Sequence, residues 1–302
     1  MVKSFAIAFL EKCFFSLFKL AIFAIPVFPQ QPNYSNYSFG WADDVFYGRL
    51  KNESWTHGVI YYDLDPFLTP EMVHAINHVI NYFNSLDVCM QWLQRIPFSF
   101  DDNVKDYISF VHHRDSPNKV FCSSKINRVG GQQQIKLGTF CVQEKLKVPL
   151  RLENTVLHEM VHAMGLHHEH QRPDRDCYIY IPPQLAARPR YTRVKGSYFP
   201  SGFPYDLYSV MHYPTSQLRV HKGNTVRLGR QNVTLSELDL HKLNHLYCGR
   251  KSYCEEHNTC ATFYDFAKTD PLCWRKGPKY ASDPRNFSNS FSDDEDISDG
   301  DE

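Results

Sequence analysis

Apolar residues along the chain follow two different periods, one typical of strands and one typical of helices. Val59–Leu64 is a β-branched and aromatic run that predicts a strand, and residues 107–111 (YISFV) and 133–137 (QQIKL) have the same character. Thr69 and Pro70 follow the first run and are preferred residues for the cap and the first turn of a helix. The chain is therefore expected to combine a sheet with helices.

Apolar residues at helical spacing predict three helices. The first follows Pro70 and has apolar positions at Met72, Val73, Ile76, Val79, Ile80 and Phe83. The second opens at Asn154 or Thr155 and has apolar positions at Val156, Leu157, Met160, Val161 and Met164. The third follows a cap at Ser236 and has apolar positions at Leu240, Leu243, Leu246 and Tyr247. Between the last two helices, residues 177–230 are rich in Pro, Tyr and Arg and are expected to be mostly irregular.

Composition and charge indicate a globular chain, and no nucleic-acid partner is expected. Hydrophobic residues make up 42% of the 302 residues, and 33 Lys and Arg balance 33 Asp and Glu. Negative charge is concentrated at the end of the chain, where residues 292–302 read SDDEDISDGDE. Because such a run cannot collapse around apolar side chains, we predict an acidic disordered tail.

The first 28 residues predict a secreted, extracellular protein. They are apolar and aromatic, with Lys3 near the start and an uncharged run over residues 20–28, as in a signal peptide. The run is shorter than the ~18 residues that span a bilayer, so no stable membrane anchor is expected. Removal of residues 1–28 takes away Cys13 and leaves an even number of cysteines that can all pair. N-glycosylation is predicted at the sequons of Asn33, Asn36, Asn52, Asn232 and Asn286.

Residues 158–170, HEMVHAMGLHHEH, have the spacing of a catalytic zinc site. His158 and His162 lie one helical turn apart, so their imidazoles project from one face. Gly165 can adopt the left-handed conformation that ends a helix, and His168 then returns as a third ligand. Three protein ligands and one open position are what a catalytic zinc requires, and the pattern H-E-x-x-H-x-x-G-x-x-H is met in full.

Other histidines and carboxylates fit the metal site less well. His167 and His170 flank the third ligand without its spacing after the glycine, so we expect them to be neighbours of the site. His74 and His78 lie four residues apart but have no carboxylate partner, which is a weak metal signal. A downstream Glu ligand is not expected, since residues 172–235 contain no Glu.

Several segments of the chain resemble the astacin family of the metzincin zinc peptidases. They are HEHQRPDRD (168–176), SVMHY (209–213), GGQQQIKLG (130–138) and LSELDLHKLNHLYC (235–248). The likeness covers about residues 55–248 and implies the α+β metzincin (zincin-like) fold, with two lobes, a twisted sheet, an active-site helix and a zinc cleft between the lobes. We therefore expect an astacin-like zinc peptidase domain at residues 49–249, with one Zn²⁺ per subunit, in a monomeric protein.

The resemblance also implies roles for residues near the metal. Glu159 would be the base that activates a zinc-bound water, and Tyr213 would stabilise the tetrahedral intermediate. Met211 would form a hydrophobic floor beneath the metal. Glu169 would pair with the amino terminus that propeptide removal frees, which implies a zymogen.

Residues 29–48 are expected to be a short pro-segment or linker. Family propeptides often block the zinc with the Asp of a Phe-x-Gly-Asp sequence, whereas the sequence FYG is followed here by Arg49. Either Asp43 or Asp44 substitutes for that Asp, or the segment does not inhibit. The sequence leaves the latency mechanism open.

Family resemblance implies the two disulfides Cys89–Cys248 and Cys122–Cys141. The cysteines left over are Cys177, Cys254, Cys260 and Cys273. Cys177 is expected to pair with one of the other three. Since an EGF-like module needs six cysteines and only three follow Cys248, we expect a short Cys-containing C-terminal extension at residues 250–291.

Together these features predict a secreted zinc metalloendopeptidase that hydrolyses internal peptide bonds of extracellular proteins. Its partners would be extended protein or peptide substrates, which residues 131–137 would bind by strand addition. A secreted zinc-binding protein that does not cleave its partners is the alternative, and a zinc hydrolase of non-peptide amides is a third possibility. The presence of Glu159 and Tyr213 favours catalysis.

Overall fold

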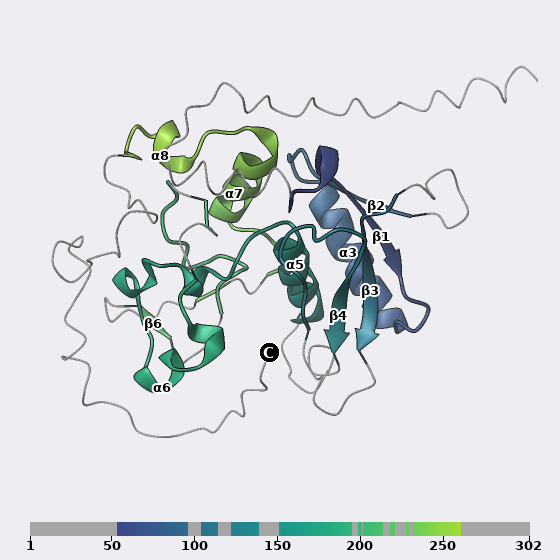
Figure 1. Ribbon diagram of the computed structural model, residues 1–302, viewed down its shortest axis with the longest axis horizontal. Helices are drawn as coiled ribbons and strands as arrows, with labels where there is room; N and C mark the ends of the chain where they lie inside the picture. The colour runs from purple at the N-terminus through teal and green to yellow at the C-terminus, as the bar shows by residue number, and fades with distance from the viewer. Residues whose placement is uncertain are drawn as a thin grey trace, which may run out of the picture. The chain divides into compact units, whose positions relative to one another are not determined.

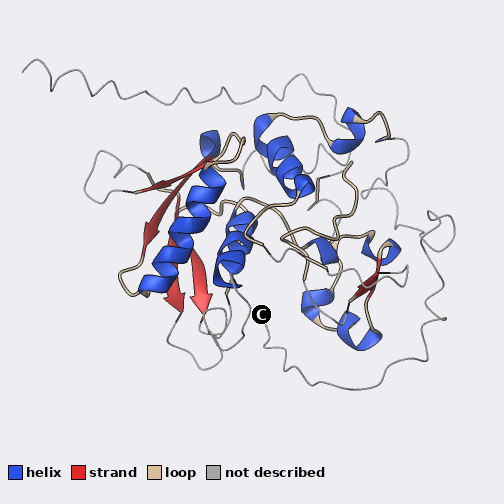
Figure 2. Cartoon of the chain, turned by 180° about the vertical axis from the view of Figure 1, so that it is seen from behind, coloured by secondary structure: helices blue, strands red, loops and turns tan. Residues whose placement is uncertain are grey.

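The structure is a computed structural model that describes nine stretches of the chain: residues 53–95, 104–113, 122–138, 151–194, 199–200, 202–213, 218–220, 228–229 and 232–260. Within them a sheet with two long helices precedes a segment of short elements and a further long helix (Figures 1 and 2). The predicted signal peptide, the pro-segment, Arg49 and the acidic tail lie outside the described residues, as does the predicted extension beyond residue 260.

The described sheet has four parallel strands in the order β2-β1-β3-β4. Their bounds are Val59–Leu64 (β1), Gln91–Gln94 (β2), Tyr107–His113 (β3) and Gln132–Gly138 (β4). β1 has the predicted bounds, and β3 and β4 contain their predicted strands and are slightly longer. β2 was not predicted because only Trp92 of its residues is buried, so no alternation of apolar residues marks this strand.

Helix α3 (Pro70–Asn84) confirms the first predicted helix. The Thr69 hydroxyl accepts a hydrogen bond from the backbone N–H of Met72, and Pro70 occupies the first turn, where it costs no helical hydrogen bond. The buried face carries Met72, Ala75, Ile76, Val79, Ile80 and Phe83. His74 and His78 lie on the exposed face. The helix thus packs its apolar stripe into the core that it shares with the sheet.

Helix α5 (Arg151–Ala163) carries the first two predicted ligands. It begins at Arg151, so the prediction that it opens at Asn154 or Thr155 was wrong by one turn. Leu152 packs against the main hydrophobic core, and this packing extends the helix beyond the cap signals of the sequence. α5 also packs against α3, so the sheet and α3 together hold the ligand helix in place.

The region expected to be mostly irregular contains only short elements among its described residues. They are β5 (Ile179–Tyr180), β6 (Arg219–Val220), α6 (Pro183–Ala186), and the 3-10 turns η4 (Glu169–Gln171), η5 (Arg175–Cys177) and η6 (Pro189–Tyr191). β5 and β6 pair antiparallel. A second hydrophobic core lies here, made of Ile179, Ile181, Leu185, Tyr191, Tyr205, Leu218 and Leu228.

Helix α7 (Glu237–Cys248) confirms the predicted cap at Ser236. The Ser236 hydroxyl and the Asp239 carboxylate form a reciprocal capping box, and Gly249 ends the helix in the left-handed conformation. α7 is not the last helix, because α8 (Tyr253–Glu256) follows it. No apolar period marks so short a helix.

Disulfides join distant parts of the chain. The implied Cys89–Cys248 bond is present, and it ties the end of α7 to the loop before β2. Cys254 pairs with Cys260, so neither is the partner of Cys177. Cys122 and Cys177 are disulfide-bonded as well, whereas Cys141 and Cys273 lie outside the described residues.

Two hydrophobic cores therefore organise the described chain, one around the sheet and one around β5 and β6. In Figure 1, α5 stands between the sheet and these short elements. This arrangement confirms the predicted α+β class and its two lobes. None of the described helices combines the length and the apolar character that a membrane span requires.

Candidate metal centre

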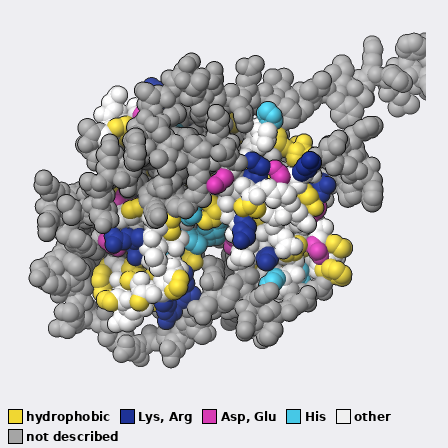
Figure 3. Space-filling model, viewed as in Figure 1, with side chains coloured by type: hydrophobic (Ala, Val, Ile, Leu, Met, Phe, Trp, Pro, Cys, Tyr) yellow, Lys and Arg dark blue, Asp and Glu magenta, His cyan; other side chains and the backbone are white. Residues whose placement is uncertain are grey.

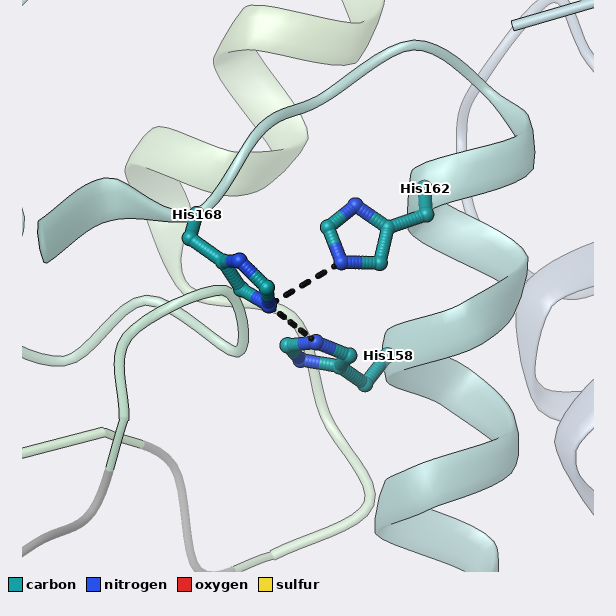
Figure 4. Close-up of side chains that lie close together, drawn as sticks. All are labelled: His158, His162 and His168. Atoms are coloured by element: carbon teal, nitrogen blue, oxygen red, sulfur yellow. Dashed lines mark hydrogen bonds between the residues drawn. The ribbon is translucent and has the colours of Figure 1, made fainter. Parts of the chain in front are cut away.

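Three histidine side chains converge where α5 faces the chain that follows it (Figure 4). His158 and His162 project from α5, and His168 returns from the loop beyond the helix. The Nε2 atom of His168 lies 3.1 Å from the Nε2 atoms of both other rings. Of the described residues, these are the ones grouped closely enough to bind one metal ion. Histidine side chains also gather at the centre of the face shown in Figure 3.

The other nitrogen of each ring faces an oxygen that can only accept a hydrogen bond. The pairs are His158 Nδ1 with the Val210 carbonyl (2.8 Å), His162 Nδ1 with the Leu166 carbonyl (2.7 Å) and His168 Nδ1 with Gln171 Oε1 (3.1 Å). Each Nδ1 must therefore carry a proton, which leaves every Nε2 with a free lone pair. Three lone pairs directed at one point form a ligand set for a cation.

The spacing and protonation of the three rings fit zinc. Two nitrogens bound to one tetrahedral zinc at 2.0–2.1 Å would lie about 3.4 Å apart, close to the separations found here. Burial, together with the two neighbouring imidazoles, lowers the pKa of His162 well below its usual value. Burial, with His158 and His170 nearby, lowers the pKa of His168 in the same direction. Both rings are therefore neutral at neutral pH, as metal ligands must be.

Gly165 makes the chain reversal between the second and third histidines possible. Its φ is +109°, which L-residues with a side chain rarely adopt. A Cβ atom at this position would also collide with the Asn127 side-chain oxygen. The Gly165 N–H donates to the His162 carbonyl (2.9 Å), and the Leu166 N–H donates to the Val161 carbonyl (3.2 Å), which ends α5. The chain then turns back and brings His168 to the metal position.

Three further predicted site residues are Glu159, Met211 and Tyr213, and all three are among the described residues. Glu159 follows His158 on α5 and is 3% exposed. Met211 is buried in the main core. The ring centroid of Tyr213 lies 4.7 Å from that of His168, with the ring planes at 65°. The ring of Tyr213 therefore contacts the histidine cluster.

The turn of residues 209–213 is held by a carboxylate that sequence reasoning did not assign to the site. Asp239 accepts hydrogen bonds from the Ser209 hydroxyl (2.6 Å) and from the Val210 N–H (2.8 Å). The Val210 carbonyl in turn accepts from the ring of His158. Asp239 therefore supports the ring of His158, a candidate metal ligand, through the single residue Val210.

Glu169 is buried in a cluster of opposite charges. Its carboxylate lies 2.8 Å from the Lys242 ammonium and 2.9 Å from the Arg172 guanidinium, and it accepts the Asp206 N–H. Burial alone would raise the pKa of Glu169, but Lys242 and Arg172 outweigh it and lower the pKa to about 2. The Glu169 N–H also donates to the Met211 carbonyl (2.9 Å), so this charge cluster is joined to the turn of residues 209–213.

The buried Glu169 cluster should make stability depend on pH. Since the pKa of Glu169 falls from 4.5 to about 2 on folding, its stabilisation is complete above pH 4.5 and is lost as the pH drops towards 2. The native protein should therefore have a higher free energy of unfolding than Glu169→Gln. This difference between the two proteins should be roughly 3 kcal/mol larger at neutral pH than near pH 2. Urea unfolding across this range measures the difference. Glu256→Gln, at a partly exposed ion pair, is the control and should cost less than about 1 kcal/mol. A difference that does not change with pH would contradict this account.

The support that Asp239 gives to the metal site can be tested through zinc affinity. Asp239→Asn places an N–H₂ group where an acceptor is needed, so the Val210 carbonyl should shift away from the His158 ring. Competition with a chelator should show zinc binding weakened by about 10–100-fold. Glu237→Gln, at an exposed position of the same helix turn, should bind zinc like the native protein. Unchanged zinc affinity in Asp239→Asn, with only lower thermal stability, would show that the carboxylate supports α7 alone.

Comparisons with known proteins identify the family. Residues 48–248 match the family model described as Astacin, which is a peptidase family. Zinc metalloproteinase nas-12 of Caenorhabditis elegans is 27% identical over 70% of this chain and 54% of its own length. The astacin-like metalloendopeptidase of Gallus gallus is 30% identical over 76% of this chain and 50% of its own length. The chain thus spans about half the length of these curated relatives.

Among solved structures, the chain is similar to High choriolytic enzyme 1, a hatching enzyme zinc-protease from Oryzias latipes (Medaka fish). The two are 25% identical, with 66% of this chain and 94% of that chain covered, at a TM-score of 0.49. The family model covers two thirds of the sequence, including all three histidines, Glu159 and Tyr213. The chain belongs to the astacin family of peptidases.

Proposed function

We propose that the protein is a secreted zinc-dependent endopeptidase that cleaves internal peptide bonds of extracellular proteins. The observation that carries this proposal is the convergence of three Nε2 lone pairs, from His158, His162 and His168. The buried carboxylate of Glu159 follows the first of these residues on α5. A structural zinc site would be closed by a fourth protein ligand, whereas the cluster found among the described residues has three. Three ligands leave a coordination position for water and substrate.

The three histidines would hold the zinc, and Glu159 would move the protons. When bound, zinc lowers the pKa of water and polarises the scissile carbonyl. Glu159 accepts the proton of the attacking water and later delivers it to the nitrogen of the leaving amine. Its place favours this role, because Glu159 follows the proposed ligand His158 on α5 and is buried, at 3% exposure.

Tyr213 would stabilise the charge that develops on the carbonyl oxygen. Its ring contacts that of the proposed third ligand, His168, with centroids 4.7 Å apart, so Tyr213 is a neighbour of the proposed metal site. A phenol is a good hydrogen-bond donor, and a donor already in place lowers the barrier without reorganisation. Met211, buried beneath the histidines, would keep the floor of the site dry.

Substrate would bind in extended form along β4. The backbone N–H and C=O of Lys136 both bond to Ser123, on the side away from β3. Because alternate residues of a strand direct these groups to the same side, Gln132 and Gln134 face that side too. A peptide that adds here gains backbone hydrogen bonds, which tolerate many side chains. The edge available to a substrate is therefore shorter than residues 131–137, because Ser123 already makes the backbone hydrogen bonds of Lys136.

Secretion and activation by processing complete the proposal. The disulfides Cys89–Cys248 and Cys254–Cys260 favour an oxidising compartment. Glu169 adjoins a cavity of about 10 Å³, room for about one water molecule, lined by Phe199, Pro200 and Lys242 among others. We propose that a freed amino terminus reaches this carboxylate, which already forms ion pairs with Lys242 and Arg172. Processing would then add the charge of the new amino terminus to the ion-pair cluster that Glu169 already forms.

Removal of the Glu159 carboxylate tests the proposal. Glu159→Ala should retain stoichiometric zinc but lose at least about 10²-fold in kcat/KM on a denatured protein substrate, because it removes the general base. Glu153→Gln, a carboxylate two turns earlier on the same helix, is the matched control and should cleave at the native rate.

Three outcomes separate the proposal from its alternatives. Equal cleavage by native protein and Glu159→Ala, after removal of the pro-segment, would favour the non-catalytic zinc-binding protein. Hydrolysis of small amides without cleavage of proteins would indicate an amidase. Cleavage that survives chelation of zinc would contradict the role of the three histidines.

A further inference from the structure

His170 is a buried imidazole that the proposed mechanism does not use. It lies in turn η4 between Glu169 and Gln171, and its side chain is fully buried. Its ring centroid is 4.1 Å from that of Tyr213, and the ring planes are tilted by 33° to each other. The ring of His168 lies farther from His170, at 5.1 Å. The closest aromatic neighbour of His170 is therefore the proposed oxyanion-stabilising residue.

The chain holds the His170 ring firmly in this position. Its Nε2 atom lies 3.0 Å from the Arg190 carbonyl, so Nε2 carries the proton and donates it there. The backbone carbonyl of His170 accepts a hydrogen bond from Arg175 (3.0 Å). The Tyr191 ring packs at 5.6 Å from His170 and at 6.0 Å from Tyr213. The imidazole is thus fixed by a ring nitrogen, by its own backbone and by an aromatic neighbour.

A second feature separates His170 from a residue that only fills space. Its Nδ1 atom is buried and has no hydrogen-bond partner among the described residues. An apolar ring would pack here without the cost of a buried, unsatisfied nitrogen. Native proteins keep such groups rarely, and their presence points to a functional constraint on the position.

We propose that His170 is a positioning residue, which orients the phenol of Tyr213 towards the carbonyl oxygen of the substrate. The ring of Tyr213 contacts two histidine rings, that of the proposed zinc ligand His168 at 4.7 Å and that of His170 at 4.1 Å between centroids. A donor stabilises an oxyanion only when it lies about 2.7–3.1 Å from that oxygen, so the tilt of the phenol ring matters. The inference rests on the proposed function, since it assigns to His170 an effect on the role of Tyr213.

Each metal ligand has an orienting hydrogen bond that does not involve His170, so His170 should act mainly on Tyr213. His168 is oriented by Gln171, whose amide N–H₂ is in turn held by the Arg190 carbonyl at 3.2 Å. His158 and His162 are oriented by backbone carbonyls. Loss of the His170 ring therefore leaves each ligand with its hydrogen bond.

A double-mutant cycle tests the inference in the processed, zinc-loaded protein. Tyr213→Phe should lower kcat by about 10²–10³-fold. His170→Ala should lower kcat by about 10–100-fold with little change in KM, since a small misplacement of a catalytic donor is costly. Combined with Tyr213→Phe, His170→Ala should cost less than about twofold more, because the residue that it positions has lost its donor.

Binding of a phosphinic peptide, a tetrahedral mimic of the reacting centre, provides a readout other than turnover. Its dissociation constant should rise in His170→Ala and in Tyr213→Phe, and the double variant should bind it about as weakly as Tyr213→Phe does. The zinc content should stay stoichiometric in all three variants. His170→Phe, which keeps an aromatic ring, should recover most of the activity if His170→Ala folds poorly. His245→Ala removes another buried imidazole, away from the metal, and should show no coupling to Tyr213→Phe.

The outcomes separate a failure of the role proposed for Tyr213 from a failure of the role proposed for His170. If Tyr213→Phe cleaves at the native rate, the proposed role of Tyr213 fails and the inference fails with it. If Tyr213→Phe is impaired but His170→Ala costs the same factor with and without Tyr213, the inference alone is wrong. If His170→Ala lowers zinc content, the ring supports the metal ligands and is not specific to Tyr213.

Discussion

Three imidazole lone pairs that face one another at about hydrogen-bond distance repel unless a cation lies between them, and the structure around them serves to hold them there. The Nε2 atoms meet at 3.1 Å because each Nδ1 is tied to an acceptor, two of them backbone carbonyls. Those acceptors come from different parts of the chain. Val210 is placed by Asp239 at the start of α7, and Leu166 follows the glycine that ends α5.

Much of this fold could be predicted from the sequence, because local chemistry and tertiary packing favour the same structure. Thr69 and Ser236 cap their helices as expected, and the β-branched run at β1 forms a central strand of the described sheet. Prediction failed where packing alone decides. Leu152 extends α5 by one turn through contact with the core, and Trp92 anchors a strand whose other residues are polar or partly exposed.

At the site, the spacing of the histidines predicts the ligands but not the residues that orient them. Periodicity places His158 and His162 on one face of a helix, and Gly165 indicates the reversal that returns His168. The surrounding residues carry no such signal, since no sequence pattern links Asp239 to the site and His170 is marked only as a neighbour of the site. Their relation to the metal arises from contacts between segments that are distant in sequence, which only the folded chain brings together.

Zinc K-edge X-ray absorption on the purified protein tests the central claim most directly. The account predicts one zinc per chain with three imidazole nitrogens at about 2.0–2.1 Å, completed by oxygen from solvent. The same spectrum from His168→Ala should show two imidazoles and weaker zinc retention. A sulfur shell, or three imidazoles that persist without His168, would contradict the metal centre described here.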